Sequence, residues 1–235
     1  MLKRLIEARW VQSLVARYDL SILERLMLAR HDFTARHKLR RVFGRGADPY
    51  QYASSCYELT RFSRMAALLG GRRFRSALEV GCAEGHFTKT LAALCGRVTA
   101  LDLSEAALGR ARRLVRQPHV TWVQANVRTW QPEESYDLMV MAEVLYYLPP
   151  PSKGPAYEKA FMLFLERLLA RLAPGGLLLL AHGYGTAADL AVREDYGQRA
   201  AGLGLRRLAS ERIGEQPHDK GMLYCLLELF EKPGA

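Results

Sequence analysis

The sequence predicts an α/β fold: a seven-stranded, mostly parallel sheet with helices on both faces, an antiparallel C-terminal strand and an N-terminal helical extension. Short apolar segments alternate with helical segments between residues 76 and 181, which is typical of a parallel sheet covered on both faces. Two successive strand-like segments then close the chain, which indicates an antiparallel pair. The 235 residues, 49% of them hydrophobic, suffice to bury a core without disulfides or a structural metal.

The chain is expected to begin with a basic helical extension over residues 1–46, followed by one domain over residues 47–235. Residues 2–17 place apolar side chains at four-residue spacing among basic ones, which predicts an amphipathic helix. Because such a helix has one apolar face, we expect it to pack on the domain or to dock to a partner.

Two more helices are expected before the first strand. One begins after Ser21, because Ser21 and Glu24 have the spacing of a capping box, and it continues to about Val42. The other is expected to start at the Asp-Pro pair at 48–49, since aspartate suits the N-cap and proline suits the first helical position. It should end at the glycine pair at 70–71, where the chain can adopt a left-handed conformation.

Seven strands follow from the periodicity of the remaining sequence. The expected strands are residues 76–80, 98–103, 120–124, 136–142, 177–181, 205–213 and 222–231. The helices between them are expected at residues 86–95, 104–116 and 157–172. Ser104 is a suitable N-cap for the second of these helices, and the Pro-Gly-Gly sequence at 174–176 ends the third.

The positive charge is confined to the first third of the chain. The formal net charge is +10, yet residues 77–235 contain 18 basic and 18 acidic residues. Residues 1–76 contain 16 basic and six acidic residues and therefore carry the whole excess. Three interpretations are open: the basic helices attract an anionic acceptor, they bind nucleic acid or an anionic membrane, or they are a solvated face.

Several classes of protein are disfavoured by simple observations. No apolar run reaches the roughly 20 residues that a membrane-spanning helix needs. The four cysteines are widely spaced and include no CxxC pair, so neither a disulfide framework nor a metal site is expected. Charged residues are scattered through residues 1–18, which is unlike a signal peptide. We therefore expect a cytoplasmic protein with free thiols.

A glycine-rich loop follows the first predicted strand of the sheet. Gly81 and Gly85 permit a tight turn and the close approach of a ligand, although a plain strand-to-helix turn has the same pattern. Asp102 follows Gly81 by 21 residues near the end of the second strand, a spacing suited to binding both hydroxyls of a ribose. Glu79 precedes the glycines and is unfavourable near a pyrophosphate, so it favours a cofactor with a cationic amino-acid end.

The sequence from Leu78 to Leu180 resembles class I S-adenosylmethionine-dependent methyltransferases, which have a Rossmann-like fold. The segments that carry the resemblance are EVGCAEG at 79–85, ALDLS at 100–104, YDLMV at 136–140, AEVLYYL at 142–148 and LAPGG at 172–176. A finer resemblance, over residues 48 to about 185, is to the NodS-like group of nodulation N-methyltransferases, which act on amino-sugar oligosaccharides. The sequences DPY at 48–50 and CYEL at 56–59 contribute to it.

The resemblance implies that the cofactor is S-adenosylmethionine. The cofactor-binding residues that it implies are Tyr57, Glu79, Gly81, Cys82, Ala83, Gly85, Asp102, Leu103, Asn126, Val127 and Ala142. Asp102 would bind the ribose, and Leu103 would pack on the adenine. Asn126 and Val127 would contact the edge of the adenine. Tyr57, on the helix before the sheet, would cover the cofactor.

The methionine part of the cofactor is expected to lie against Glu79, the glycine-rich loop and the backbone of Ala142. Two positions depart from the family's pattern. Ala83 replaces the middle glycine of the loop, which is tolerable if its φ angle is negative. Asn126 replaces an acidic residue, and its amide can still donate and accept hydrogen bonds at the adenine edge. These departures leave open a non-catalytic binding subunit of the same fold.

Candidate catalytic residues follow the fourth and fifth strands, whose carboxyl ends line the site in this architecture. An amine acceptor must lose a proton before it attacks the methyl group, and a carboxylate or a histidine can take that proton. Glu143, Tyr147 and His182 are the candidates, together with Tyr146. Each has a structural alternative: Glu143 could cap the following helix, the tyrosines could form pocket walls, and His182 could be a satisfied polar group at a strand end.

The expected function is therefore S-adenosylmethionine-dependent methylation of a small molecule or saccharide, with N-methylation of an amino sugar as its most specific form. RNA methylation guided by the basic N-terminal helices is the alternative enzymatic activity. The segment AEVL at 142–145 differs from the Asn/Asp-Pro-Pro-Tyr signature of enzymes that methylate the amino groups of bases, which disfavours nucleic acid. A non-catalytic binding subunit is the alternative outside enzymes.

Overall fold

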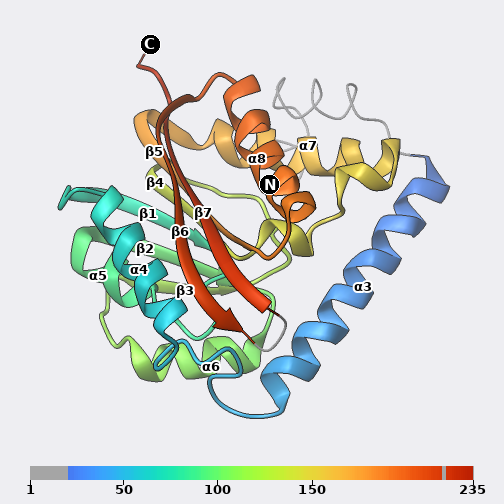
Figure 1. The fold of residues 1–235 in the computed structure, drawn as a ribbon. Helices are drawn as coiled ribbons and strands as arrows, with labels where there is room; N and C mark the ends of the chain where they lie inside the picture. The colour runs from blue at the N-terminus through green and yellow to red at the C-terminus, as the bar shows by residue number, and fades with distance from the viewer. Residues whose placement is uncertain (1–20, 219–220, 235) are drawn as a thin grey trace.

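The sheet contains seven strands in the order β3-β2-β1-β4-β5-β7-β6, in a computed structural model that describes residues 21–218 and 221–234 (Figure 1). The strands are β1 (Phe74–Val80), β2 (Cys95–Asp102), β3 (Val120–Gln124), β4 (Tyr136–Ala142), β5 (Leu172–Tyr184), β6 (Arg206–His218) and β7 (Gly221–Glu231). Neighbouring strands from β3 to β5 are parallel, whereas β7 is antiparallel to both β5 and β6. The predicted fold class is confirmed.

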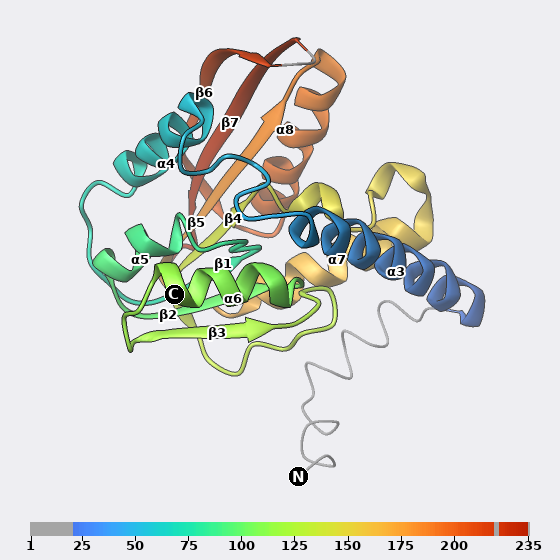
Figure 2. The same ribbon diagram turned by 90° about the horizontal axis from the view of Figure 1, so that it is seen from below.

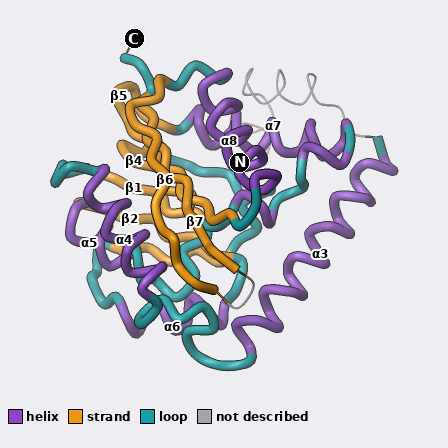
Figure 3. Tube along the Cα trace, in the orientation of Figure 1, coloured by secondary structure: helices purple, strands orange, loops and turns teal. Residues whose placement is uncertain are grey.

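Helices cover both faces of the sheet (Figure 3). They are α3 (Ile22–Gly44), α4 (Cys56–Leu68), α5 (Thr88–Leu94), α6 (Glu105–Leu114), α7 (Pro155–Ala170) and α8 (Ala187–Gly202). Side chains of α4, α5 and α6 share one buried cluster with Ala77 of β1, and those of α7 and α8 share another with Leu78. Successive residues of a strand point to opposite faces, so the central strands β1, β2, β4 and β5 contribute to both clusters. Among the described residues, no helix is long and apolar enough to cross a membrane.

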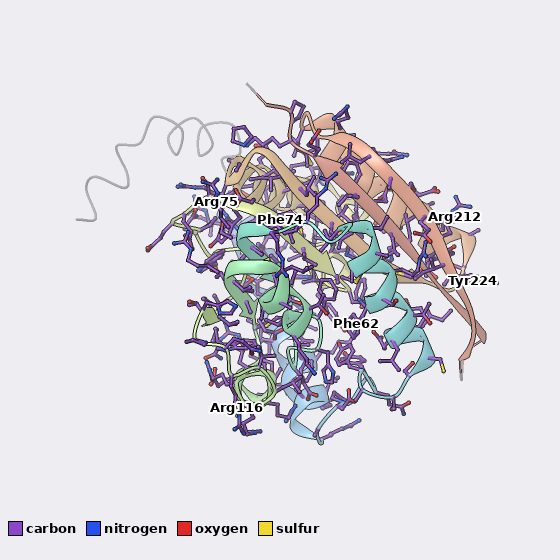
Figure 4. The ribbon with its side chains drawn as sticks, turned by 90° about the vertical axis from the view of Figure 1, so that its left-hand side faces the viewer. Phe62, Phe74, Arg75, Arg116, Arg212 and Tyr224 are labelled. Carbon is purple, nitrogen blue, oxygen red and sulfur yellow. The ribbon has the colours of Figure 1, made fainter. Side chains whose placement is uncertain are left out.

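The packing of α4 on the sheet determines where its first turn lies. Figure 4 looks onto α4 and α5, with Phe62 of α4 near α5. Phe62 stacks on Phe87, with 5.8 Å between the ring centroids, and Met65 and Leu69 are fully buried. Aromatic pairs of this kind contribute about 1 kcal/mol beyond the burial of their area. α4 is therefore held firmly, and its N-terminal residues Tyr57 and Glu58 are placed at the carboxyl edge of the sheet.

The helix α8 is absent from the predicted elements, although its start carries a local signal. The hydroxyl of Thr186 accepts a hydrogen bond from the N–H of Asp189, and the Asp189 carboxylate accepts one from the N–H of Thr186, both at 3.1 Å. This reciprocal pair is a capping box. Tyr196 and Ala200 of α8 are buried against the sheet. The Thr-x-x-Asp spacing was therefore the sequence signal for this helix.

The helix α3 lies across the carboxyl edge of the sheet (Figure 2). It packs against α6 and α7, which cover opposite faces of the sheet, and Asp32 forms an ion pair with Arg128 beyond β3. The predicted capping box is confirmed: the N–H of Ser21 donates to Glu24 at 2.7 Å, and the Ser21 hydroxyl accepts from the N–H of Glu24 at 3.2 Å. The helix predicted for residues 2–17 lies outside the described residues.

The predicted start of the next helix at residues 48–49 is wrong. Asp48 has a φ angle of 49°, in the left-handed region, so a helix cannot begin there. Its carboxylate instead accepts hydrogen bonds from the N–H groups of Tyr52 and Ala53, at 2.6 and 3.0 Å, which closes a turn. α4 begins only at Cys56, and its predicted end beside the glycine pair is confirmed.

Candidate active site

A cavity of about 770 Å³ lies at the carboxyl edge of the sheet. It is lined by residues at the ends of β1, β2 and β4, by α3 and by residues 49–58. The strand order places β1 between β2 and β4, so the connections diverge there, and open α/β sheets bind ligands at such a point. The volume is typical of cofactor and small-molecule sites.

Eleven of the predicted site residues line this cavity. They are Tyr57, Gly81, Ala83, Asp102, Leu103, Asn126, Val127, Ala142, Glu143, Tyr146 and Tyr147. The four others, which are buried and do not line it, are Glu79, Cys82, Gly85 and His182. All fifteen lie near the carboxyl edge. Glu79, Cys82 and His182 point their side chains into the core, and Gly85 packs against α6.

Asp102 ends β2 and lines the cavity. Its Oδ1 accepts a hydrogen bond from the N–H of Ser104 at 2.8 Å, and its Oδ2 accepts one from the N–H of Ala83 at 2.9 Å. Burial raises the pKa of Asp102, and these hydrogen bonds oppose that rise. A carboxylate oxygen can accept two hydrogen bonds, so each oxygen has capacity for one more. This capacity fits the two hydroxyls of a ribose.

Gly81 and Gly85 have different roles in the loop after β1. Gly81 has a φ of +76°, and a Cβ there would lie 2.8 Å from Cγ2 of Val144. Gly85 has a φ of +83°, and a Cβ there would lie 3.0 Å from the Cβ of Ala111 on α6. Neither the left-handed backbone nor these contacts suit a larger residue. Gly81 therefore lets the loop lie against Val144 after β4, whereas Gly85 lets the loop pack against α6.

Ala83, which stands where the family has its middle glycine, has an unfavourable backbone conformation. Its φ angle is 47°, so the condition of a negative φ, under which an alanine is readily tolerated, is not met. The left-handed conformation is less favourable for alanine than for glycine by roughly 1 kcal/mol. The same conformation directs the N–H of Ala83 to Asp102, so the loop retains its contact with the carboxylate despite this cost.

Glu79 lies behind the cavity wall. Its side chain shares the α4–α5 face of the sheet, and the hydroxyl of Thr88 donates to its Oε2 at 2.5 Å. Burial raises the pKa of Glu79 to about 8. Its carboxyl group is therefore mostly protonated at neutral pH, and its side chain does not line the cavity.

The predicted adenine end of the cavity is partly closed by α3. Leu103, Asn126 and Val127 line this end. The side-chain oxygen of Asn126 accepts a hydrogen bond from the N–H of Arg128 at 3.0 Å, and Arg128 forms the ion pair with Asp32 of α3. The position of α3 at the cavity is therefore coupled to the loop that carries Asn126.

Glu143 follows β4, and three groups surround its carboxylate. Its Oε1 accepts a hydrogen bond from the N–H of Gly183 at 2.7 Å, and its Oε2 accepts one from the Tyr146 hydroxyl at 2.8 Å. The Tyr57 hydroxyl donates to Oε1 at 3.4 Å. The alternative of a helix cap is wrong, because the short 3₁₀ helix that follows has Val144 as its N-cap and no side-chain cap bond. Glu143 is thus an oriented carboxylate on the cavity wall.

Tyr146 and Tyr147 also line the cavity. Their ring centroids lie 4.8 Å apart, and the Tyr147 hydroxyl lies 3.1 Å from the hydroxyl of Tyr50. Burial raises the pKa of both Tyr146 and Tyr147, so both hydroxyls keep their protons. These tyrosines are therefore suited to shape the cavity and to donate hydrogen bonds rather than to remove a proton.

His182 points away from the cavity. It is 2% exposed, and its ring meets the ring of Tyr196 of α8 edge-on, with 5.4 Å between the ring centroids. Its Nε2 accepts a hydrogen bond from the N–H of Leu145 at 3.4 Å. Burial lowers the pKa of His182 well below its usual value. Residues alternate along β5, so the position between Ala181 and Gly183 faces α8. In this arrangement His182 has the role of a satisfied polar group in the core.

Three charged residues near Glu143 were missed by sequence reasoning. Arg61 is 2% exposed and forms an ion pair with Glu58, and its Nε lies 4.0 Å from Oε1 of Glu143. Burial raises the pKa of Glu58, and the Arg61 cation opposes that rise. Arg193 of α8 donates from its Nε to the carbonyl of Gly183 at 2.9 Å. The i,i+3 spacing of Glu58 and Arg61 was a usable signal, whereas Arg193 lay in a helix that was not predicted.

The divergent connections at β1, the carboxylate that ends β2 and the oriented carboxylate after β4 surround one cavity. Together with the sheet order, they define a class I S-adenosylmethionine-dependent methyltransferase. The donor set fits the cofactor, because Asp102 retains two acceptor positions at the cavity and Leu103 and Val127 supply an apolar surface beside them.

Comparison with known proteins gives the family. The model described as nodulation protein S (NodS) matches residues 34–170, and the chain belongs to this NodS family. Nodulation protein S from Sinorhizobium fredii is 33% identical over 192 residues, which cover 79% of this chain and 83% of that protein. Nodulation protein S from Rhizobium tropici is 40% identical over 144 residues, which cover 60% of this chain and 56% of that protein.

A solved structure agrees with this assignment. The N-methyltransferase NodS from Bradyrhizobium japonicum WM9, in complex with S-adenosyl-L-homocysteine, superposes with a TM-score of 0.69 and 27% identity. The superposition covers 85% of this chain and 98% of that chain. The predicted family, the enzyme class and S-adenosylmethionine as the cofactor are confirmed.

Proposed function

We propose that this enzyme transfers a methyl group to a free amino group of an amino-sugar oligosaccharide. Membership of a family of nodulation N-methyltransferases supports an amine acceptor. The observation that carries the proposal is the Glu143 carboxylate, held on the cavity wall by Gly183 and Tyr146. When bound, S-adenosylmethionine supplies an electrophilic methyl group on a sulfonium, so the residues of this chain mainly need to align the acceptor and remove its proton.

The cofactor is proposed to lie along the ends of β1 and β2. Asp102 would accept hydrogen bonds from the ribose, and Leu103 and Val127 would contact the adenine. The loop at 81–83 would contact the methionine part, with Ala142 beside it. This orientation directs the reactive end toward the wall formed by β4 and β5.

Glu143 is proposed as the general base. An amine is protonated in water at neutral pH and has no free lone pair, so it must lose a proton before it attacks a methyl group. Glu143 has neighbours that fix its direction: the N–H of Gly183, the hydroxyl of Tyr146 and the hydroxyl of Tyr57. The nearby Arg61 cation supplies a counter-charge to both carboxylates, Glu58 and Glu143.

The acceptor is proposed to lie against the aromatic wall of the cavity. Tyr50, Tyr52, Tyr146 and Tyr147 all line it. A tyrosine presents an apolar ring face and a polar hydroxyl. A sugar ring has a matching character, with an apolar C–H face and a hydroxyl-bearing edge. We also propose that the basic extension ends near residue 46. The helix α3 then belongs to the extension and covers one side of the cavity.

The proposal is tested by a transfer assay with labelled S-adenosylmethionine. The acceptor is a chito-oligosaccharide with one deacetylated residue, and mass spectrometry of the product locates the methyl group. The fully acetylated oligosaccharide is the matched control, because it has the same sugars without a free amine. We expect methylation of the first and not of the second. Equal methylation of both, or transfer to a carboxylic acid or RNA but not to the amine, would reject it.

The Glu143→Gln variant tests the base in the same assay. It retains the size of the side chain and loses the ability to take the proton, so we expect turnover to fall by roughly 10²–10⁴-fold. The affinity for S-adenosylhomocysteine, measured by calorimetry, should be unchanged. Turnover within a factor of two of the wild type would reject Glu143 as the base.

A further inference from the structure

The outward side of α3 carries an unusual concentration of apolar side chains. Five of the ten large hydrophobic side chains that are strongly exposed in the described part of the chain belong to this helix. Ile22 is 80% exposed, Leu23 68%, Leu26 62% and Phe33 72%, and Met27 is the fifth. Isolated exposed apolar residues are ordinary, but a contiguous group on one surface marks an interaction site. We call the exposed side of this helix the outer face of α3.

The outer face of α3 is also basic. Arg30, Arg36, Arg40 and Arg41 are all exposed. The two acidic residues of the helix, Glu24 and Asp32, lie on its inner side and form ion pairs there.

The partners in these ion pairs are Lys159, whose Nζ lies 3.5 Å from a carboxylate oxygen of Glu24, and Arg128, which pairs with Asp32. Within the described part of the chain, the outer face therefore combines apolar residues in its first half with arginines in its second half, Arg36, Arg40 and Arg41, that form no ion pair. Such a surface suits a partner that is apolar beneath an anionic layer.

We propose that the outer face of α3 binds the surface of an anionic phospholipid membrane. Leu26 and Phe33 would enter the boundary between headgroups and acyl chains, and Arg36, Arg40 and Arg41 would contact the phosphates. Interfacial helices combine apolar and basic side chains in this way, and anionic lipids attract each cation near the surface. The helix lies along one side of the molecule, where a flat surface can reach it (Figure 2).

Two other partners fit less well. A second copy of the chain would place the cations of one outer face against those of the other in a parallel two-fold contact, whereas an antiparallel contact centred on residues 22–33 would bury the apolar half and leave Arg36, Arg40 and Arg41 without an anionic partner. Nucleic acid would satisfy the arginines but leaves the exposed Ile22, Leu26 and Phe33 without an apolar counterpart. An anionic membrane satisfies both halves of the surface.

The apolar half of the outer face precedes the part of the chain that the family model matches. The family match begins at residue 34, whereas the exposed apolar residues lie between Ile22 and Phe33. The inner side of the same helix lines the active-site cavity with Asp32 and Leu39. Membrane docking through α3 would therefore hold the mouth of the cavity near the bilayer and is independent of which acceptor is methylated.

The test is sedimentation of the full-length protein with vesicles of two compositions. One is pure phosphatidylcholine, and the other contains roughly one part phosphatidylglycerol to three parts phosphatidylcholine. We expect the wild type to bind the anionic vesicles and not the neutral ones, with binding lost at high salt because the attraction is screened. Failure to bind anionic vesicles at low salt would overturn the proposal.

Variants then separate α3 from the rest of the chain. The double variant Leu26→Gln/Phe33→Gln should weaken binding to anionic vesicles by about tenfold or more. The matched control is Leu59→Gln/Leu114→Gln, which makes the same kind of change at leucines that are 50% and 44% exposed on other helices, and it should bind like the wild type. Because none of these side chains lines the cavity, all variants should retain their affinity for S-adenosylhomocysteine.

A pair of charge variants completes the test. One removes three cations from the outer face and the other removes three exposed cations near the end of α6, so their net charges are equal. They are Arg36→Gln/Arg40→Gln/Arg41→Gln and Arg112→Gln/Arg113→Gln/Arg116→Gln. Binding to the anionic vesicles should fall more in the α3 variant than in the α6 variant. Equal losses in both, undiminished binding of the Leu26→Gln/Phe33→Gln variant, or a dimer that this variant dissociates without any vesicle binding would each overturn the proposal.

Discussion

The N–H of Gly183 donates a hydrogen bond to Oε1 of Glu143 at 2.7 Å and so joins the end of β5 to the residue after β4. Glu143 itself has a φ angle of 53°, and its own N–H donates to the carbonyl of Ala181 at 2.8 Å. The contact with Ala181 fixes the backbone of Glu143 on β5, and the contact with Gly183 fixes the direction of its carboxylate. We infer that this direction, rather than the mere presence of a carboxylate, makes Glu143 suited to accept a proton from the substrate.

Gly183→Ala should lower turnover on the amine acceptor. A Cβ at this position would lie 2.8 Å from the Tyr57 hydroxyl and 3.1 Å from Oε1 of Glu143, so both groups must move. Displacement of a catalytic group by such a distance typically lowers kcat by about 10- to 100-fold. Gly202→Ala is the control, because nothing lies within 4 Å of its added methyl group. Steady-state kinetics on the amine acceptor provides the measurement, and an unchanged kcat would contradict the assigned geometry.

Arg61→Met should destabilise the fold, because it leaves Glu58 beside Glu143 without a buried counter-charge. Breaking a buried ion pair on one side typically costs about 3 kcal/mol of unfolding free energy. Removing the second charge as well, in Glu58→Gln/Arg61→Met, should recover part of that loss. Urea denaturation of Glu58→Gln, Arg61→Met and the double variant gives the coupling free energy between Glu58 and Arg61. Strictly additive losses would show that the pair is not energetically coupled.

Asp102→Asn should weaken cofactor binding through the ribose. Losing a hydrogen bond to a charged acceptor typically costs about 1.5–3 kcal/mol, so the Kd for S-adenosylhomocysteine should rise by about 10- to 100-fold. The control uses the ligand: the wild type should bind adenosine more tightly than 2′-deoxyadenosine, and the variant should distinguish them less. Calorimetry measures all four affinities. A variant that discriminates between the two nucleosides as well as the wild type does would refute the ribose assignment.

Glu79→Gln should change the pH dependence of stability. Burial raises the pKa of Glu79 to about 8 in the folded protein, whereas an exposed glutamate titrates near 4.5. Between these values the unfolded chain releases the proton that the folded chain retains, so the wild type loses stability as pH rises through this window. Each pH unit there costs up to about 1.4 kcal/mol. Urea midpoints at several pH values should diverge, with Glu79→Gln becoming relatively more stable toward pH 8. Parallel profiles would contradict the raised pKa.

Local signals in the sequence account for most of the architecture. The alternation of apolar strands with capped helices predicted the sheet, and the capping spacing of Ser21 predicted the start of α3, because strand periodicity and helix capping depend on neighbours in sequence. The start of α4 could not be read in this way. An Asp-Pro pair is compatible with a helix start or with a turn, and the left-handed backbone of Asp48 makes it a turn.

The sequence by itself determined the order of the elements, the glycine-rich loop, the position of Asp102 at the end of β2 and the position of Glu143 after β4. Tertiary structure decided which side chains reach the cavity: Glu143 faces it, whereas His182 and Glu79 are turned away by strand alternation. It also brought Arg61 to Glu143 and laid α3 across the carboxyl edge. These contacts join residues far apart in the chain, and they depend on packing between layers, which no local pattern encodes.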